Sequence, residues 1–377
     1  MAAVAVAAKR ARAAWPPILM RWGVTPAAAV LWVWHEVLVL VAPRIPFAAG
    51  PNPPFFGVPW YHFDVGWYYW IADSGYLPAH AQMAAYFPGV PAYLWLVHAT
   101  VIALIGLQLL LLLLIGQVGL LARAWGLSGR RVGLVQALFA LSPAAVFYST
   151  AYPEAWMVLG LCGALLAMRA GKPWQAALWS TLAGVVDPLG LVVGVGAVTW
   201  ALHSAIRRNW PSFQDGVAWG PGTAAALALV MGVLTVSLGQ PLAFIRAQQA
   251  WGASWTIPGV QVVEALRAAS TLPATLAALG MLPIVAVGVV GLWTRAVVSA
   301  WHRASAVIGA ALFLVPLSFY SNRAPLSSTG LFLSTDVPAV IGLSALVSRR
   351  LAWVPLLWYG IWSAVGAVLF THGWFWG

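Results

Sequence analysis

The sequence predicts an all-α, polytopic membrane protein, and three observations support that class. Apolar residues make up 62% of the chain and charged residues only 7%, and a water-soluble protein of this length could not cover such a composition with polar groups. The apolar residues fall in long runs bounded by charged residues, Pro or Gly. Lys and Arg gather in alternate connections between these runs, as they do in helical membrane proteins.

The apolar runs predict about eleven membrane helices, because about 20 residues are needed to cross a bilayer. The fourth and fifth runs are short for full crossings, which is typical of segments that line a protected cavity. The first run follows basic residues, as in a signal peptide, but it contains Glu36 and shows no cleavage site, so it is expected to stay as the first span. The predicted spans are 24–42, 94–121, 132–150, 155–169, 174–187, 189–206, 218–238, 274–294, 304–320, 331–348 and 351–371.

The basic residues predict the topology. With the N-terminus inside, the outer loops hold only Arg44, Arg246, Arg267 and Arg323 of the 19 Lys and Arg. The positive-inside rule therefore predicts a cytoplasmic N-terminus and an outer C-terminus. All of the eight Asp and Glu except Asp215 fall in or next to the outer loops, so any acid-dependent chemistry is expected on that side.

Residues 1–377 are expected to form one transmembrane domain, without a separate soluble domain, a linker or an internal repeat. Two outer loops are long, 43–91 and 239–272, and both are rich in aromatic residues. Aromatic residues at this density favour interfacial or re-entrant segments. The compact chain, with no large loops, favours a bacterial plasma membrane.

Composition and spacing argue against several functional classes. The net charge of +11 is explained by Arg-rich turns that face anionic headgroups, because no block of like charges points to nucleic acid. A lone Cys162 excludes a disulfide within the chain and a cysteine metal site. There is no His-Glu-x-x-His spacing, no Asp-x-Asp pair and no Gly-rich phosphate loop, so no bound metal, cofactor or nucleotide donor is expected.

The most informative motif for chemistry runs from His62 to Tyr76, directly after the first span. If residues 63–73 are helical, a rotation of about 100° per residue puts Tyr68 and Ile71 on the face of Asp64 and turns Asp73 to the opposite face. Asp64 would then lie among aromatic residues at the outer mouth of the bundle, where a carboxylate can act as general base. The structural alternative is a cap of an interfacial helix.

This motif resembles the GT-C class of membrane glycosyltransferases, and more narrowly the PIG-V type mannosyltransferases and their bacterial relatives. That family has an Asp in the first outer loop followed by Trp-Tyr, Ile-Ala and Gly-Tyr. Three further elements occur in the family's order: Tyr-Phe-Pro-Gly-Val-Pro at 86–91, Pro-x-x-x-Phe-Tyr-x-x-x-Tyr-Pro-Glu at 143–154, and Phe-x-x-Ala-Gln-x-x-Trp at 244–251. The four elements extend from about residue 60 to 260.

Two positions depart from the family's pattern. Where the family has Arg-x-x-Gly after the fifth span, this chain has Asp187-Pro188-Leu189-Gly190. Where the family has Arg-Tyr near the tenth span, this chain has residues 330–336 without a base, and the nearest base is Arg323. If those arginines bind the donor phosphate in relatives, this chain must bind it differently or use another donor.

The resemblance implies an inverting transfer of a sugar, mannose in the family, from a polyprenyl-phosphate donor to a lipid or glycan hydroxyl on the outer face. Asp64 would be the catalytic base. Arg246 is the best-placed outer base for the donor phosphate, with Gln249 on the same helical face and Arg323 as the substitute. A snorkelling role at lipid headgroups is the alternative for Arg246.

Further candidates for substrate contacts flank these positions. Glu154 is a candidate second acid, and His62 and Trp67 lie beside Asp64 in the motif. Each has a structural alternative: Glu154 as a carboxylate at a helix N-terminus, and His62 as a packed ring.

Asp187 and Asp336, each near a Pro, are expected to be helix caps, with a substrate contact still open for Asp187. An intramembrane Glu36 points to function, or to an internal pair with His35.

Two other functions fit the sequence. The first is a transporter or flippase for a lipid or small solute, for which only Glu36 and Asp187 provide the expected ionisable residues. The second is an inactive GT-C-like scaffold, which the two departures from the family pattern favour. Asp64 distinguishes best between an enzyme and a scaffold.

Overall fold

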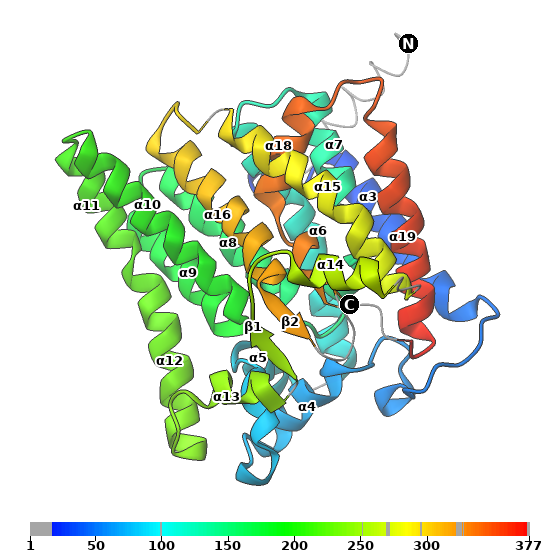
Figure 1. Ribbon diagram of the computed structural model, residues 1–377. Coiled ribbons are helices and arrows are strands. Elements are labelled where there is room, and N and C mark those ends of the chain that lie inside the picture. Colours follow the sequence, from blue (N-terminus) through cyan, green and yellow to red (C-terminus); the bar gives the residue numbers. More distant parts are fainter. Residues whose placement is uncertain are drawn as a thin grey trace.

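Helices form nearly all of the structure, a computed structural model that describes residues 17–98, 100–250, 252–268, 272–294, 296–321, 326 and 328–374 (Figure 1). Within these residues, seven helical segments are long and apolar enough to cross a membrane. The chain is therefore a helical, multi-pass integral membrane protein. The seven segments are Pro26–Arg44 (α3 and a 3-10 turn), Thr100–Ala124 (α6), Pro188–Ile206 (η5 and α10), Trp210–Leu238 (α11 and α12), Pro273–Trp293 (α15), Ala300–Leu317 (α16) and Trp353–Thr371 (α19).

Shorter helices occupy the remaining predicted spans. Of these, α8 lies inside the bundle against α6, α9 and α16, and most of its side chains are buried. Gly160 and Gly163 permit this position, because a Cβ at either would lie within 3 Å of Trp179 or Ala183 on α9. The shorter helices are Gly129–Ala140 (α7), Glu154–Arg169 (α8), Pro173–Val186 (α9), Thr329–Ser334 (α17) and Val337–Leu346 (α18).

Three predicted spans are interrupted. The span predicted at 132–150 ends as a helix at Ala140, because Pro143 disfavours helical backbone at Ser142, and the 3-10 helix η4 (Ala145–Tyr148) follows. The span predicted at 94–121 begins inside α5 (Gly89–Val97), which ends at a left-handed His98 before α6. The span predicted at 331–348 divides at Asp336, which caps α18 by accepting a hydrogen bond from the Ala339 N–H at 2.9 Å.

Small residues let α15 and α18 pack closely. A Cβ at Gly288 would lie 2.2 Å from the Ala339 carbonyl oxygen, and one at Gly342 would lie 2.0 Å from the Gly288 oxygen. Gly291 faces Gly342 in the same way, at 2.4 Å. Close backbone approach at small residues is typical of helices packed within a membrane.

The two long loops, 43–91 and 239–272, fold against each other at one end of the bundle, the lower end in Figure 1. The first contains α4 (Asp64–Ser74) and the 3-10 helix η3 (Pro78–Ala85) before α5, and the second contains α13 (Ala243–Ala250), β1 (Ala253–Trp255) and α14 (Val260–Arg267). Helix α13 packs against η3. A short strand was not predicted: β1 pairs antiparallel with β2 (Phe319–Ser321), with Trp255 opposite Phe319.

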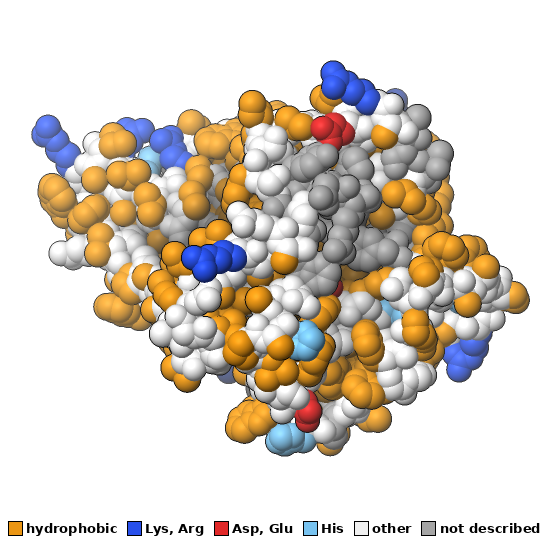
Figure 2. All heavy atoms as spheres, turned by 60° about the horizontal axis from the view of Figure 1, so that its bottom comes forward, with side chains coloured by type: hydrophobic (Ala, Val, Ile, Leu, Met, Phe, Trp, Pro, Cys, Tyr) orange, Lys and Arg blue, Asp and Glu red, His pale blue; other side chains and the backbone are white. Residues whose placement is uncertain are grey.

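Hydrophobic side chains cover much of the surface seen from this end, with few charged groups among them (Figure 2). Large apolar residues such as Val236, Ile206 and Leu178 are more than 70% exposed. Exposure on this scale suits a protein whose outer helical faces contact lipid rather than water.

Candidate functional site

Asp64 opens the first turn of α4 and is the best-connected candidate base. The chain enters the helix through Phe63, which adopts a positive φ of 55°. The Tyr86 hydroxyl donates a hydrogen bond of 3.0 Å to Oδ1 of Asp64, and the Asp64 backbone N–H donates to the Tyr152 hydroxyl at 3.3 Å. The carboxyl is half-buried, so it combines fixed partners with access from outside.

The predicted faces of α4 are confirmed. Tyr68 and Ile71 are buried on the side of α4 that packs into the bundle, and the half-buried Asp64 lies on the same side. Asp73 is exposed on the opposite side, where its carboxylate accepts a hydrogen bond from the Ser74 hydroxyl at 3.2 Å. Of the two acids in the motif, only Asp64 is therefore part of an enclosed site.

The structure brings Asp64, Glu154 and Asp187 together, and we call these three residues the carboxylate cluster. Glu154 is the first residue of α8 and is only 2% exposed. Asp187 ends α9 and caps η5 (Pro188–Val192), accepting a 2.6 Å hydrogen bond from the Leu189 N–H. The buried Tyr68 lies in the field of all three: burial first, and then the charges of the three carboxylates, raise the pKa of its hydroxyl well above the ordinary value.

Burial sets the protonation of the cluster. Burial raises the pKa of Asp64 to about 6, against the opposing hydrogen bond from Tyr86. Burial also raises the pKa of Asp187 to about 6, against the Leu189 N–H. The pKa of Glu154 lies well above its ordinary value, first because of burial and then because of the charges of Asp187 and Asp64. No basic side chain among the described residues offsets these effects.

The cluster can therefore hold two kinds of acid at neutral pH. Asp64 is mostly ionised there, yet it is a stronger base than an exposed carboxylate. Glu154, with its raised pKa, holds its proton more tightly than an ordinary carboxyl, and its Oε2 is buried with no hydrogen-bond partner among the described residues. Two acids whose environments separate their protonation states are a common arrangement in acid–base catalysis.

Aromatic rings hold Tyr86, whose hydroxyl donates the hydrogen bond to Asp64, in position. Trp67, half-buried, stacks on Tyr86 with ring centroids 6.0 Å apart and on Trp70 at 5.4 Å. The Tyr76 hydroxyl donates to the Tyr86 carbonyl at 2.6 Å, and Tyr68 contacts the Tyr86 ring edge-on at 5.3 Å. Trp67 therefore packs directly on the ring whose hydroxyl binds Asp64, and its predicted contact with a substrate stays a prediction.

His62 is packed among aromatic rings, and its predicted contact with a substrate stays a prediction. Its ring is 1% exposed and packs against Phe63 and Phe370, each with centroids 5.7 Å away. Burial lowers the pKa of the imidazole, so it is neutral at neutral pH. The structure gives it no contact with Asp64. His62 instead connects the start of α4 to the end of α19.

Arg246 and Gln249 are on α13, as the predicted helix required, but they point away from the bundle. Both side chains are exposed, and Arg246 donates a 2.9 Å hydrogen bond to the Gln240 side chain. The buried face of α13 carries Ala243 and Ala247. The structure gives neither Arg246 nor Gln249 a contact with the carboxylate cluster, and Arg323 lies outside the described residues.

Sequence reasoning missed the tyrosines as partners of Asp64. Tyr86 and Tyr152 each occur in a motif that is similar to one of the resembled family, next to a Pro-containing turn. Their place in these motifs was the signal that could have indicated them as partners of Asp64. The pair of His35 with Glu36 is not formed; His35 Nε2 lies 2.9 Å from the Ser149 hydroxyl instead.

Within the described part of the chain, no group of three or more His, Cys, Asp or Glu side chains has the geometry to hold a metal ion. Comparison with known proteins adds no assignment: no family model, no curated protein and no solved structure matches this chain.

Proposed function

We propose that the protein is a GT-C-type glycosyltransferase that moves a sugar from a polyprenyl-phosphate donor to an acceptor hydroxyl. The observation that carries the proposal is Asp64, a half-buried carboxyl with a pKa of about 6 that accepts a hydrogen bond from Tyr86. It lies at the end of the bundle where the long outer loops meet (Figure 1). A base with these properties suits deprotonation of a hydroxyl at neutral pH.

In the proposed reaction, Asp64 takes the proton of the acceptor hydroxyl as its oxygen attacks the anomeric carbon of the donor sugar. The bond from that carbon to the phosphate oxygen breaks, and polyprenyl phosphate leaves with the electron pair. Attack from the side opposite to the leaving group inverts the anomeric centre. Tyr86 holds the Asp64 carboxylate in position, and protonated Glu154 supplies a hydrogen-bond donor to a sugar hydroxyl.

Arg246 is proposed as the contact for the donor phosphate. Helix α13 packs against η3, directly before Tyr86, and Phe244 contacts Phe87 edge-on at 5.5 Å. The exposed guanidinium can exchange its hydrogen bond to Gln240 for a bidentate contact with phosphate oxygens. Gln249 is proposed to support the donor from the same exposed side.

The proposed setting is a bacterial plasma membrane, with about eleven crossings, a cytoplasmic N-terminus and the carboxylate cluster outside. Seven described segments are long and apolar enough to cross, and the proposed count adds the shorter helices that occupy the other predicted spans. The lipid tail of the donor would lie along the exposed apolar helix faces, and the acceptor would reach Asp64 from the water side.

The experiment measures release of polyprenyl phosphate by purified protein from a panel of polyprenyl-phosphate sugars, with crude membrane lipids as acceptors. The wild type and Asp73→Asn are expected to release it at equal rates, and Asp64→Asn is expected to release none while staying folded in detergent. Release by Asp64→Asn at the wild-type rate would remove Asp64 from the chemistry. No release by folded wild type with any donor would favour a transporter or an inactive scaffold.

The phosphate contact has its own test. Arg246→Ala is expected to raise the donor concentration needed for half-maximal rate by about tenfold, the effect of losing one charge-assisted contact. Arg267→Ala removes an exposed arginine at the end of α14 and is the matched control, expected to leave donor use unchanged. If Arg246→Ala and wild type need the same donor concentration for half-maximal rate, the contact with the donor phosphate would be assigned to Arg323 instead.

A further inference from the structure

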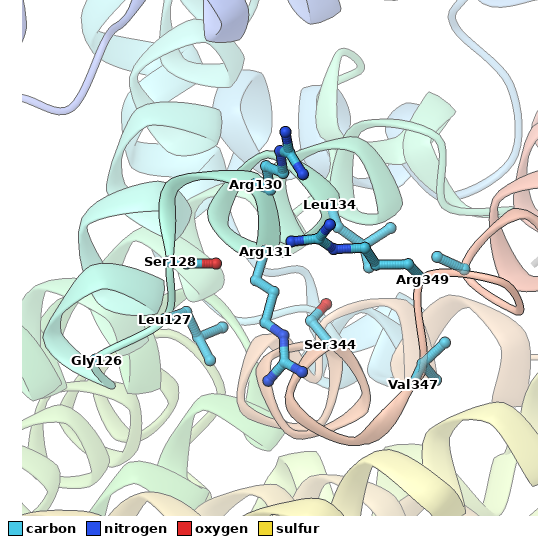
Figure 3. A pocket seen from close by; sticks show the side chains of 10 residues that line it. Gly126, Leu127, Ser128, Arg130, Arg131, Leu134, Ser344, Val347 and Arg349 are labelled. Carbon is cyan, nitrogen blue, oxygen red and sulfur yellow. The ribbon is translucent and has the colours of Figure 1, made fainter.

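A cavity of about 510 Å³ is lined by residues at the start of α7 and around the end of α18, and these elements lie at the other end of the bundle from α4 (Figure 1). It lies between the start of α7, the end of α18 and the start of α19. Arg130, Arg131 and Arg349 project around it (Figure 3). None of the described residues that line it is acidic, so three positive charges surround this cavity without a carboxylate to balance them.

The N-terminus of α7 adds further donors. Ser128 precedes the helix in extended conformation, and its side chain makes no capping hydrogen bond. The first N–H groups of a helix have no acceptor within the helix, and with the helix dipole they favour a bound anion. Ser128 itself lines the cavity, so these N–H groups lie at its edge.

Ser344 is the observation that points to a ligand. It lies on α18, is 0% exposed, and lines the cavity. Its hydroxyl has no hydrogen-bond partner among the described residues, although buried hydroxyls are nearly always paired. Ser305, which is equally buried, shows the usual alternative for a helical serine, because it donates to the Trp301 carbonyl at 2.9 Å.

Arg131 is held in a fixed position at the cavity, unlike an arginine that is free on the surface. It is half-buried and donates a 2.8 Å hydrogen bond to the Ala345 carbonyl in the last turn of α18. This contact fixes one guanidinium beside Ser344, and arginines that only snorkel to headgroups need no such anchor.

We propose that this cavity binds a phosphate group, held by the guanidinium groups of Arg130, Arg131 and Arg349, the α7 N-terminus and the Ser344 hydroxyl. Arginine forks and a helix N-terminus both match phosphate oxygens. Leu134 and Val347 on the lining provide an apolar wall for a carbon chain attached to that phosphate. The ligand class is an anionic phospholipid headgroup or a free phosphate.

The test is native mass spectrometry of the full chain in neutral detergent, titrated with phosphatidylglycerol and, separately, with diacylglycerol of the same acyl chains. The wild type is expected to retain one phosphatidylglycerol and little diacylglycerol. The double variant Arg130→Gln/Arg349→Gln removes two guanidiniums but keeps the Arg131 bond, and it should bind phosphatidylglycerol about tenfold more weakly or worse. Arg207→Gln/Arg208→Gln, two exposed arginines outside the cavity, is the charge-matched control and should stay near wild type.

Ser344→Ala gives a second, milder test, with Ser305→Ala as its control. We expect Ser344→Ala to weaken phosphatidylglycerol binding several-fold and Ser305→Ala to leave it unchanged. Inorganic phosphate added as a competitor distinguishes the two ligands. If it displaces phosphatidylglycerol, the cavity is a site for free phosphate; if it does not, the cavity is a site for the lipid headgroup. Equal loss in both arginine double variants, equal binding of diacylglycerol, or unchanged binding in Ser344→Ala would overturn the proposal.

Discussion

Replacing Asp64 by Asn should make the folded protein more stable at neutral pH, because the native structure holds this carboxylate where its charge is poorly solvated. Burial raises the pKa of Asp64 from 3.8 to about 6. The folded state therefore binds the Asp64 proton more tightly than the unfolded state does. Stability from this residue is greatest below pH 3.8, falls as the pH rises, and levels off above about pH 6.

The size of the effect follows from the same change in pKa. It corresponds to about 3 kcal/mol of folding free energy lost at pH 7 relative to pH 3. Asn keeps an oxygen that can accept the Tyr86 hydrogen bond, but its amide N–H groups must find partners, at a cost of about 1–2 kcal/mol. We therefore expect a net gain of about 1–2 kcal/mol at pH 7.5, or a rise in Tm on the order of 1–3 °C.

The assay is thermal unfolding in detergent, followed by intrinsic Trp fluorescence from pH 4 to 8. Asp73→Asn is the matched control, since Asp73 is exposed on the opposite face of α4, and its change should stay within about 0.5 kcal/mol. The Tm difference between Asp64→Asn and wild type should shrink toward pH 4. Equal Tm values at pH 7.5 for the two variants, or a difference independent of pH, would refute the argument.

Three further predictions concern the neighbours of Asp64 and the helix packing. Tyr86→Phe removes the hydrogen bond that lowers the Asp64 pKa, so the pH below which transfer is lost should rise from near 6 by about one unit. Tyr93→Phe is the control, because the Tyr93 hydroxyl donates to the Ala103 carbonyl instead. It should leave the pH–rate profile unchanged. Glu154→Gln replaces a protonated acid by a neutral amide, so it should change the free energy of unfolding at pH 7 by no more than about 1 kcal/mol while slowing transfer. A large rise in Tm at pH 7 would show instead that Glu154 is ionised in the wild type, because Gln would then remove a buried charge. Gly288→Leu should destabilise the protein by roughly 1–3 kcal/mol in thermal unfolding, because the Cβ of the new side chain alone would lie 2.2 Å from the Ala339 oxygen. An unchanged Tm would contradict the close packing of α15 on α18.

Much of the fold follows from local pattern. Runs of apolar residues bounded by breaks predicted where the helices occur, because the bilayer and the 3.6-residue period act on consecutive residues. The same period predicted which side of α4 carries Asp64. What local pattern could not predict is where a run is interrupted, as at His98, because that depends on the neighbours the chain meets after folding.

The part of the site that depends on local sequence pattern was predictable. Asp64 was found from a local motif, and Asp187 as a cap from its Pro. That Glu154 and Asp187 share a cluster with Asp64 depends on where folding places the start of α8 and the end of α9 relative to the start of α4, which no local pattern contains. The exposure of Arg246 was missed for a related reason: helical spacing shows which residues share a face of α13, but not which face packs against η3.

The most direct test of the central claim is a covalent product. Wild-type protein would be incubated with crude membrane lipids and a polyprenyl-phosphate sugar carrying a ¹³C label in the sugar, and the lipids analysed by mass spectrometry and NMR. The account predicts an acceptor that gains one labelled sugar with inverted anomeric configuration, formed by Asp73→Asn and wild type but not by Asp64→Asn. Labelled donor that stays chemically unchanged with folded wild-type protein, or a product formed equally by Asp64→Asn, would contradict it.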